Sequence, residues 1–264
     1  MAKRKERIVA KDFGNITVPT SWDEVKLKDF ITLMKLQEEE GKEEPSIVDI
    51  MAVLTGTDKK YIYSLPSDFA NTIMAHLLLL NKPLKEEPKA EVIIDGNLYK
   101  INYMEKLKFG EYTDANTVMA NDKFDYASLL AILCRREGEI YDDDYIAEHL
   151  DERTEMWNNQ PITKVYPLVC FFFDLIRTIR ETFAALYDGR RTSNRPIADT
   201  YRRFAEKWGG QKVLFELCQS TVEIEKVAQT YVTTVLNYLS YLKDKAIAEK
   251  AQDDLDEQIR KAKR

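Results

Sequence analysis

Residues Ile162–Leu186 have the sequence ITKVYPLVCFFFDLIRTIRETFAAL. Apolar side chains recur along it at helical spacing, and Phe171–Phe173 places aromatic rings on every side. A helix that is apolar all round belongs in the interior of a protein. The stretch therefore predicts the central helix of a mainly helical fold, ending at Asp188–Gly189.

The same stretch is the nearest approach to a membrane span in this chain. Between Val165 and Leu175 it is interrupted by Pro167 and Asp174, and it is shorter than the ~18 apolar residues that crossing a bilayer requires. The N-terminus, Met1–Arg7, is basic, but no apolar segment follows it. We therefore expect no membrane span, no signal peptide and a protein that is soluble and cytosolic when it is made.

The composition supports a helical protein with a real core. The 264 residues are 44% hydrophobic and 32% charged, with only 9 Gly and 8 Pro, and the formal net charge is −6. Few turn-forming residues and many charged ones are typical of helices, and the hydrophobic fraction excludes a disordered chain. The length allows one large domain or two of ordinary size.

A β-hairpin is marked by a change in the spacing of apolar residues, from a helical period of 3.6 residues to a strand period of 2. Glu91–Ile94 and Asn97–Tyr103 flank Asp95–Gly96, a strong signal for a two-residue turn. In that register Glu91 opposes Lys100. One face of the hairpin is then apolar and consists of Val92, Ile94, Tyr99, Ile101 and Tyr103.

An isolated hairpin is marginally stable, so a third strand is needed. We expect it from the N-terminal segment, near Ile8–Ala10 or Ile16–Val18. Before the hairpin we expect helices that begin at a capping box of Ser21 and Glu24, at Pro45–Ser46, at Lys59 and at Ser67.

The C-terminal segment predicts a long helix. A heptad seam runs through Leu217, Thr221, Ile224, Ala228, Tyr231, Val235, Tyr238 and Leu242. A helix over residues 211–264 would be roughly 80 Å long at ~1.5 Å per residue, so its last ~20 residues project or dock on something else. The candidate contacts with a neighbouring subunit there are Ile247, Ala251, Leu255 and Ile259. The alternative is a solvated tail.

Together these signals predict a mainly α protein. We expect a helical bundle with a small antiparallel hairpin or sheet (about 91–103 plus an N-terminal strand) and a long projecting C-terminal helix. The predicted parts are a basic arm or strand at 1–18, a helical body at 19–210 with the hairpin at 90–104 and a basic loop at 189–203, and the C-terminal helix at 211–264.

Charge is segregated along the chain. Between Arg177 and Lys212 there are nine basic and four acidic residues, a net charge of +5 in an acidic protein. Arginines clustered in a loop suit phosphates, so this loop is a candidate contact for DNA or an acidic partner; the alternative is a solvated turn. The candidate residues are Arg190, Arg191, Arg195, Arg202 and Arg203. The basic arm Lys3–Lys11 is either an arm that orders on binding or a plain unstructured start.

Signals of enzyme chemistry are weak. No glycine-rich phosphate loop, nucleophile elbow or H-E-x-x-H motif occurs. The two histidines, His76 and His149, are interpreted as a core or boundary residue and a solvent-facing residue. The three cysteines are widely spaced in apolar runs and predict buried thiols in a reducing compartment. They are Cys134, Cys170 and Cys218.

An acidic cluster between Glu137 and Glu152 is the best candidate for a metal site. Asp142–Asp144 more simply cap a helix that begins near Tyr145, because the helix dipole favours carboxylates at its N-terminus. The alternative is a divalent cation held by Glu139, Asp142 and Asp144. We expect no metal, no cofactor and no enzyme activity.

Several short motifs in the first half of the chain occur in a familiar order. They are PTSWDEV at Pro19–Val25, VLTG at Val53–Gly56, Leu65–Pro66, NKP at Asn81–Pro83 and IDGNLY at Ile94–Tyr99. This combination resembles uncharacterised proteins encoded in the morphogenesis clusters of tailed bacteriophages, especially crAss-like and other phages of Bacteroidetes. Some of those relatives are labelled tail assembly chaperones and others virion proteins. The resemblance carries no catalytic residue.

The resemblance implies a bacteriophage structural protein. We expect a multi-copy component of the portal, connector or tail region, forming a homo-oligomeric ring that contacts other phage structural proteins and, without sequence preference, packaged DNA. It would be found in the virion, and in the host cytoplasm during assembly. The alternative is a tail assembly chaperone absent from the virion, binding tail proteins in an apolar groove between the helices of Phe30–Leu36 and Leu77–Leu80. A metal-dependent enzyme is a third possibility.

Overall fold

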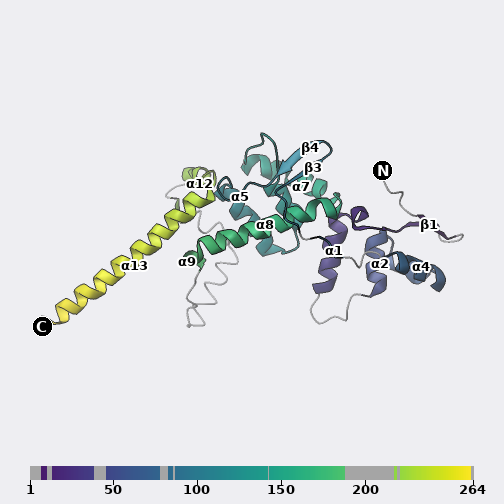
Figure 1. Ribbon diagram of the computed structural model, residues 1–264, viewed down its shortest axis with the longest axis horizontal. Helices are drawn as coiled ribbons and strands as arrows, with labels where there is room; N and C mark the ends of the chain where they lie inside the picture. The colour runs from purple at the N-terminus through teal and green to yellow at the C-terminus, as the bar shows by residue number, and fades with distance from the viewer. Residues whose placement is uncertain are drawn as a thin grey trace. The chain divides into compact units, whose positions relative to one another are not determined.

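The computed structural model describes residues 7–10, 14–38, 46–77, 83–85, 87–141, 143–187, 217–218 and 221–262. The protein is mainly helical, with a small antiparallel sheet and a long C-terminal helix, so the predicted fold class is confirmed (Figure 1). The chain forms two compact units. Unit 1 contains Met1–Ile101 and Asn121–Phe172, and unit 2 contains Asn102–Ala120 and Phe173–Arg264.

The elements of unit 1 are β1 (Arg7–Ala10), β2 (Gly14–Thr17), the 3₁₀ helix η1 (Trp22–Glu24), α1 (Leu27–Glu38), α2 (Ile47–Thr55), α3 (Lys59–Tyr63), α4 (Ser67–Leu77), β3 (Glu91–Ile94), β4 (Asn97–Lys100), α6 (Tyr126–Leu133), β5 (Arg135–Arg136) and α7 (Asp143–Asn158). The elements of unit 2 are α5 (Phe109–Asn121, its last residue assigned to unit 1), α9 (Ala184–Tyr187), α12 (Thr221–Ala228) and α13 (Val232–Ala262). The boundary falls inside α8 (Ile162–Thr182).

The most enclosed helix of unit 1 is α6. All of its residues except Ser128 are buried, and it packs along α7, whose Trp157 is also fully buried. Helix α8 instead buries one face: Phe172 is buried, whereas Phe173 is 44% exposed. The prediction that Phe171–Phe173 is enclosed on all sides is therefore wrong, because α6 takes the central position.

The hairpin has the predicted register. Glu91 pairs with Lys100, and the turn residues Asp95 and Gly96 have φ angles of +49° and +80°, as a two-residue type I′ turn requires. On the apolar face Ile94, Tyr99 and Ile101 are buried, but Tyr103 is exposed because the chain turns there toward Leu107.

The predicted source of the third strand is wrong. That strand is β5, which pairs with β4 through Tyr99 and Arg136, whereas β1 and β2 pair only with each other among the described strands. The physical reason is local. Strands β1 and β2 follow one another directly in the chain, so they form backbone hydrogen bonds with each other as a separate hairpin. Strand β5 follows the buried helix α6 and lies at the edge of β4.

Of two predicted helix starts, one is decided by its cap and the other is not. Ser46 and Asp49 form a reciprocal capping box at the start of α2, and Gly56 ends that helix in the left-handed conformation with φ +65°. The capping box predicted for Ser21 and Glu24 is wrong. Glu24 instead accepts a 2.8 Å hydrogen bond from the backbone N–H of Thr20, and the helix begins only at Leu27.

Helix α1 begins late because Val25 is extended and Lys26 forms a β-bridge to the junction between α7 and α8. The N–H of Leu27 donates to the Gln160 carbonyl (2.9 Å), and the N–H of Ile162 donates to the Val25 carbonyl (2.8 Å). Lys26 therefore lies opposite Pro161, and its ammonium donates to the Asn159 side chain at 3.0 Å. This pairing ends α7 and begins α8.

Unit 2 contains a second junction of the same construction. The N–H of Phe109 donates to the Thr230 carbonyl (2.8 Å), and the N–H of Val232 donates to the Leu107 carbonyl (2.9 Å). Lys108 lies opposite Tyr231, with its ammonium over the ring and donating to the Gln229 carbonyl at 2.8 Å. In each unit a lysine-centred segment thus pairs with the residues that separate two helices.

The second junction corrects the predicted C-terminal helix. Helices α12 and α13 are separate, so the chain is not helical throughout 211–264 and the heptad seam does not continue across Gln229–Tyr231. The repeated junction has a signal in the sequence that the prediction of one continuous helix overlooked. VKLKDF at Val25–Phe30 resembles LKFGEY at Leu107–Tyr112, and QPITKV at Gln160–Val165 resembles TYVTTV at Thr230–Val235.

Candidate functional site

The arginines of the predicted basic loop lie outside the described residues. This applies to all five candidate contacts, Arg190, Arg191, Arg195, Arg202 and Arg203, and also to most of the basic arm at the N-terminus. The contact with DNA or an acidic partner stays a prediction.

The predicted metal candidates are not gathered into a ligand set where the structure describes them. Glu139 forms an ion pair with Arg153 (3.3 Å) and lies 4.0 Å from Arg136, while Asp142 and the side chain of Asp144 lie outside the described residues. Across the described part of the chain, no cluster of three or more potential ligands could hold a metal ion. Glu139 therefore orients an arginine.

The cysteines differ in burial. Cys134 is fully buried, and its burial raises the pKa of the thiol above the ordinary value despite the nearby guanidinium of Arg153. Cys170 and Cys218 are partly exposed, so the prediction of buried thiols is confirmed for Cys134 alone. A thiol held in the protonated form is a poor nucleophile, so Cys134 acts as a core residue.

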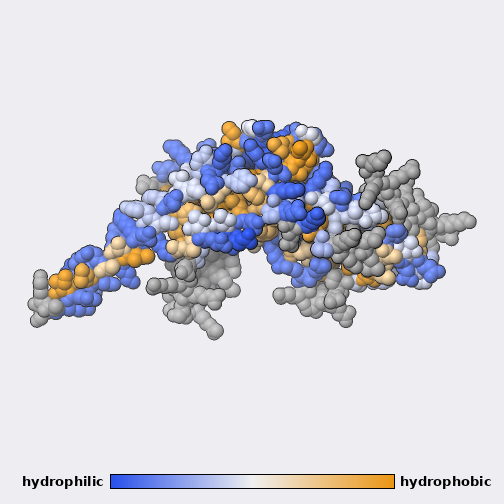
Figure 2. Space-filling view, viewed as in Figure 1, coloured by the Kyte–Doolittle hydropathy of each residue, from blue (hydrophilic) through white to orange (hydrophobic). Residues whose placement is uncertain are grey.

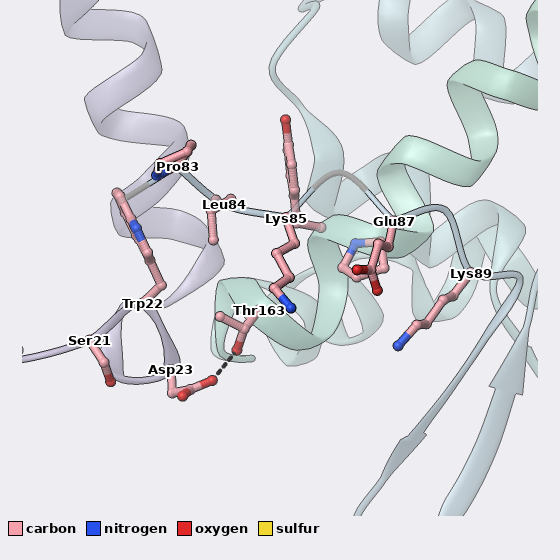
Figure 3. A pocket seen from close by; sticks show the side chains of 11 residues that line it. Ser21, Trp22, Asp23, Pro83, Leu84, Lys85, Glu87, Lys89 and Thr163 are labelled. Atoms are coloured by element: carbon pink, nitrogen blue, oxygen red, sulfur yellow. Dashed lines mark hydrogen bonds between the residues drawn. The ribbon is translucent and has the colours of Figure 1, made fainter. Parts of the chain in front are cut away.

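An open pocket lies in unit 1 between η1, the segment at 83–89 and the start of α8 (Figure 3). Its volume is about 360 Å³. Trp22 and Tyr166 provide aromatic walls, and each packs edge-on against Phe30 with ring centroids 6.0 and 5.7 Å apart. Asp23 accepts a 2.6 Å hydrogen bond from Thr163 at the rim.

The charged groups of this pocket are of both signs. Lys85 and Lys89 face it together with Asp23 and Glu87, and the backbone N–H of Lys89 donates to the carbonyl of Pro167 at 3.0 Å. Such a recess can accept a polar peptide segment. Its described lining includes neither histidine nor cysteine, and the bond from Thr163 to Asp23 ties η1 to the start of α8.

The groove predicted for a chaperone is only partly described. The described apolar residues of α1 beyond Leu27 are half-buried, Leu77 is buried, and residues 78–80 lie outside the described part of the chain. Its capacity for a client protein stays a prediction.

Helix α13 is the strongest candidate site because only its first part is packed. Val232, Val235 and Leu236 are buried in unit 2, and the ammonium of Lys243 donates to the Ala185 carbonyl of α9. From residue 244 to residue 261 every residue except Asp256 is exposed. With 31 residues α13 is about 46 Å long, and Figure 1 shows no other described element of unit 2 beside its C-terminal part.

The four predicted subunit contacts all lie on this exposed part. Ile247, Leu255 and Ile259 are 59%, 49% and 43% exposed, and Ala251 is exposed as well. Figure 2 shows hydrophobic side chains along this part of α13. Steps of four residues advance about 40° around a helix, so these four residues wind around it.

A straighter line of exposed apolar residues follows a heptad. We name it the outer stripe: Tyr238, Tyr241, Ala248, Leu255 and Ile259. Its steps of three, seven, seven and four residues keep one side of the helix facing a partner, as in a coiled coil. Lys245 and Gln252 occupy the two heptad positions between them. The stripe was not predicted from the sequence, because the seam predicted there mixed the buried and exposed faces.

Charges surround the outer stripe unevenly. Between Glu249 and Glu257 there are five carboxylates and one lysine, a net charge of −4. Intrahelical pairs support the exposed helix: Lys245 lies 3.6 Å from Glu249, and Glu257 lies 2.6 Å from Lys261. The part of the outer stripe around Leu255 therefore lies in an acidic stretch of α13, which is followed by Arg260 and Lys261.

Comparisons of the chain with protein-family models, with curated proteins and with solved structures gave no match. None of the helices in the described ranges is long and apolar enough to cross a membrane. The function is therefore inferred chiefly from the surface of α13.

Proposed function

We propose that this protein works by protein–protein assembly, as a multi-copy structural component of a bacteriophage virion in its portal, connector or tail region. The observation that carries the assembly role is the exposed part of α13. Leu255 and Ile259 are 49% and 43% exposed on the part of the helix that no described element of unit 2 covers. Exposed apolar residues in a line, rimmed by charge, mark interaction sites.

The phage setting is supported by the resemblance of the first half of the chain to morphogenesis-cluster proteins. In this setting the helical body packs laterally against identical subunits in a ring, and α13 reaches another structural protein of the portal, connector or tail. The basic loop Arg190–Arg203 faces packaged DNA or an acidic partner. The protein has no enzymatic role in this proposal, and it resides in the virion after assembly in the host cytoplasm.

The test is an inventory of purified phage particles from the culture that produces the protein. Mass spectrometry of the particles is expected to detect it in multiple copies, and electron microscopy is expected to place it near the tail vertex. Its absence from mature particles overturns the structural role.

The second candidate is a tail assembly chaperone that leaves before the particle matures. The open pocket in unit 1, which can accept a polar peptide segment, favours it. Co-expression with tail subunits distinguishes the two: a soluble complex with a tail protein, together with absence from particles, supports the chaperone.

A further inference from the structure

We propose that the outer stripe of α13 is the docking site for a basic amphipathic helix of a different protein, and not for a second α13. This inference rests on the proposed assembly function and names the chemistry of the partner. Three features support it: the repeated junction, the residues that interrupt the stripe and the charge around it.

The repeated junction shows that corresponding positions are covered in unit 1. Leu168 and Phe172 lie six and ten residues after Ile162, just as Tyr238 and Leu242 lie six and ten residues after Val232. Leu168 and Phe172 are 0% and 2% exposed, whereas Tyr238 and Leu242 are 52% and 37% exposed. At Tyr238, where the outer stripe begins, α13 therefore has a large apolar side chain at a place that is covered in unit 1 but is not covered by the described part of unit 2. Leu242 lies beside the stripe, and Thr178, the counterpart of Ala248, is itself exposed.

The interruptions of the stripe disfavour pairing between two copies of α13. In a parallel, in-register pair Lys245 faces its own counterpart, and the acidic stretches meet, so like charges are opposed. In the antiparallel pair that sets Tyr241 against Ile259, the heptad sets Lys245 against Leu255. Apart from Glu249 of its own helix, the Lys245 ammonium then has no acceptor across the interface, which penalises this alignment relative to one with an acidic residue opposite the lysine.

The charge around the stripe specifies the occupant. Between residues 237 and 258 the heptad positions directly beside the seam carry three carboxylates, Asp244, Glu249 and Asp256, and no basic residue. A helix with apolar heptad positions and Lys or Arg at the flanking positions would cover the stripe and pair with these carboxylates. From Tyr238 to Ile259 the stripe is about 32 Å long, so one helix of about three heptads covers it.

The test uses two synthetic 28-residue probes and the full-length protein. Both peptides carry Ile and Leu at the heptad seam, except for one Glu at the seam position that faces Lys245. At the flanking positions one peptide has Lys and the other has Glu. Fluorescence anisotropy at low salt is expected to give a Kd on the order of micromolar for the Lys peptide, because single-helix contacts are small. Binding is expected to be at least tenfold tighter than for the Glu peptide and to weaken at higher salt.

Variants on the exposed helix separate docking from general attraction. Leu255→Asp is expected to weaken binding of the Lys peptide at least tenfold, although it adds a negative charge that would strengthen nonspecific attraction. Ile247→Asp is the matched control, since Ile247 is 59% exposed and lies about 80° around the helix from Leu255. It is expected to change the affinity by less than threefold.

Three results overturn the proposal. They are equal affinity for the two peptides, unchanged affinity in Leu255→Asp, and a dimer in light scattering that Leu255→Asp converts to monomer. The particle inventory tests the proposed function separately, because its result does not depend on which helix binds α13. Failure of peptide docking with the protein present in particles overturns only this inference.

Discussion

Arg153 of α7 is expected to be one of the most sensitive residues in unit 1. Its side chain is 9% exposed, and its guanidinium donates to the Ala131 carbonyl at 3.0 Å and to the Cys134 carbonyl. Those carbonyls belong to the C-terminal end of α6, where no intrahelical N–H is available. The third contact is the ion pair with Glu139 at 3.3 Å.

The magnitude follows from these contacts. Hydrogen bonds to a charged group contribute about 1.5–3 kcal/mol each, and breaking a buried pair by removing one partner costs about 3–5 kcal/mol. When Arg153 is replaced, Glu139 remains partly exposed to solvent and close to Arg136, which limits the cost of leaving its carboxylate without Arg153. We therefore expect Arg153→Met to lower the free energy of unfolding of unit 1 by about 3–5 kcal/mol. Arg153→Lys keeps the charge but loses the fork, and is expected to cost about half as much.

The measurement is equilibrium urea unfolding, followed by circular dichroism and by tryptophan fluorescence, to which the buried Trp157 contributes. The matched control is Arg177→Met. Arg177 also forms an ion pair, 2.7 Å from Asp174, but both side chains are largely exposed, and the change is expected to be within about 0.5 kcal/mol. If the free energy of unfolding of Arg153→Met is within about 1 kcal/mol of that of the unmodified protein, the end of α6 is not stabilised by this arginine.

Three further predictions concern the hairpin, a buried phenol and a buried thiol. Gly96→Ala is expected to cost about 1 kcal/mol in urea unfolding, because Gly96 has φ +80°; Gly96→Asn should recover most of it, and equal losses in both would contradict this role of the turn. Burial raises the pKa of Tyr126 to about 12, whereas a phenol in the unfolded chain ionises near 10. The folded state therefore keeps this proton to higher pH than the unfolded state, and the free energy of unfolding falls as pH rises from about 10 to about 12. Tyr126→Phe is expected to reduce this pH dependence, measured as the urea midpoint at each pH. An unchanged dependence of the midpoint on pH would contradict the assignment. Cys134 is expected to react with a thiol reagent only on unfolding while the partly exposed Cys170 and Cys218 react in the folded protein, and a Cys134→Ser variant that loses a fast-reacting thiol would contradict this assignment.

Several local features are determined by the sequence alone. The turn at Asp95–Gly96 sets the register of its hairpin, and Ser46 and Gly56 set the two ends of α2. Each of these depends on groups a few residues apart, whose geometry is governed by backbone sterics and local hydrogen bonds. The candidate site was partly predictable for the same reason. Apolar residues scattered among charges predicted that Leu255 and Ile259 lie on an exposed helix.

Other features were decided only by the tertiary structure. The C-terminal helix is interrupted because Lys108 reaches a backbone carbonyl 121 residues away, and α1 starts late because Lys26 meets a side chain 133 residues away. Backbone pairing over such separations outweighs the helical preference of the residues at the junction, which continue the heptad pattern without a break. The outer stripe of α13 emerged only once that junction had assigned Val235 to the core and Tyr238 to the surface, because periodicity alone does not say which side of a helix is covered.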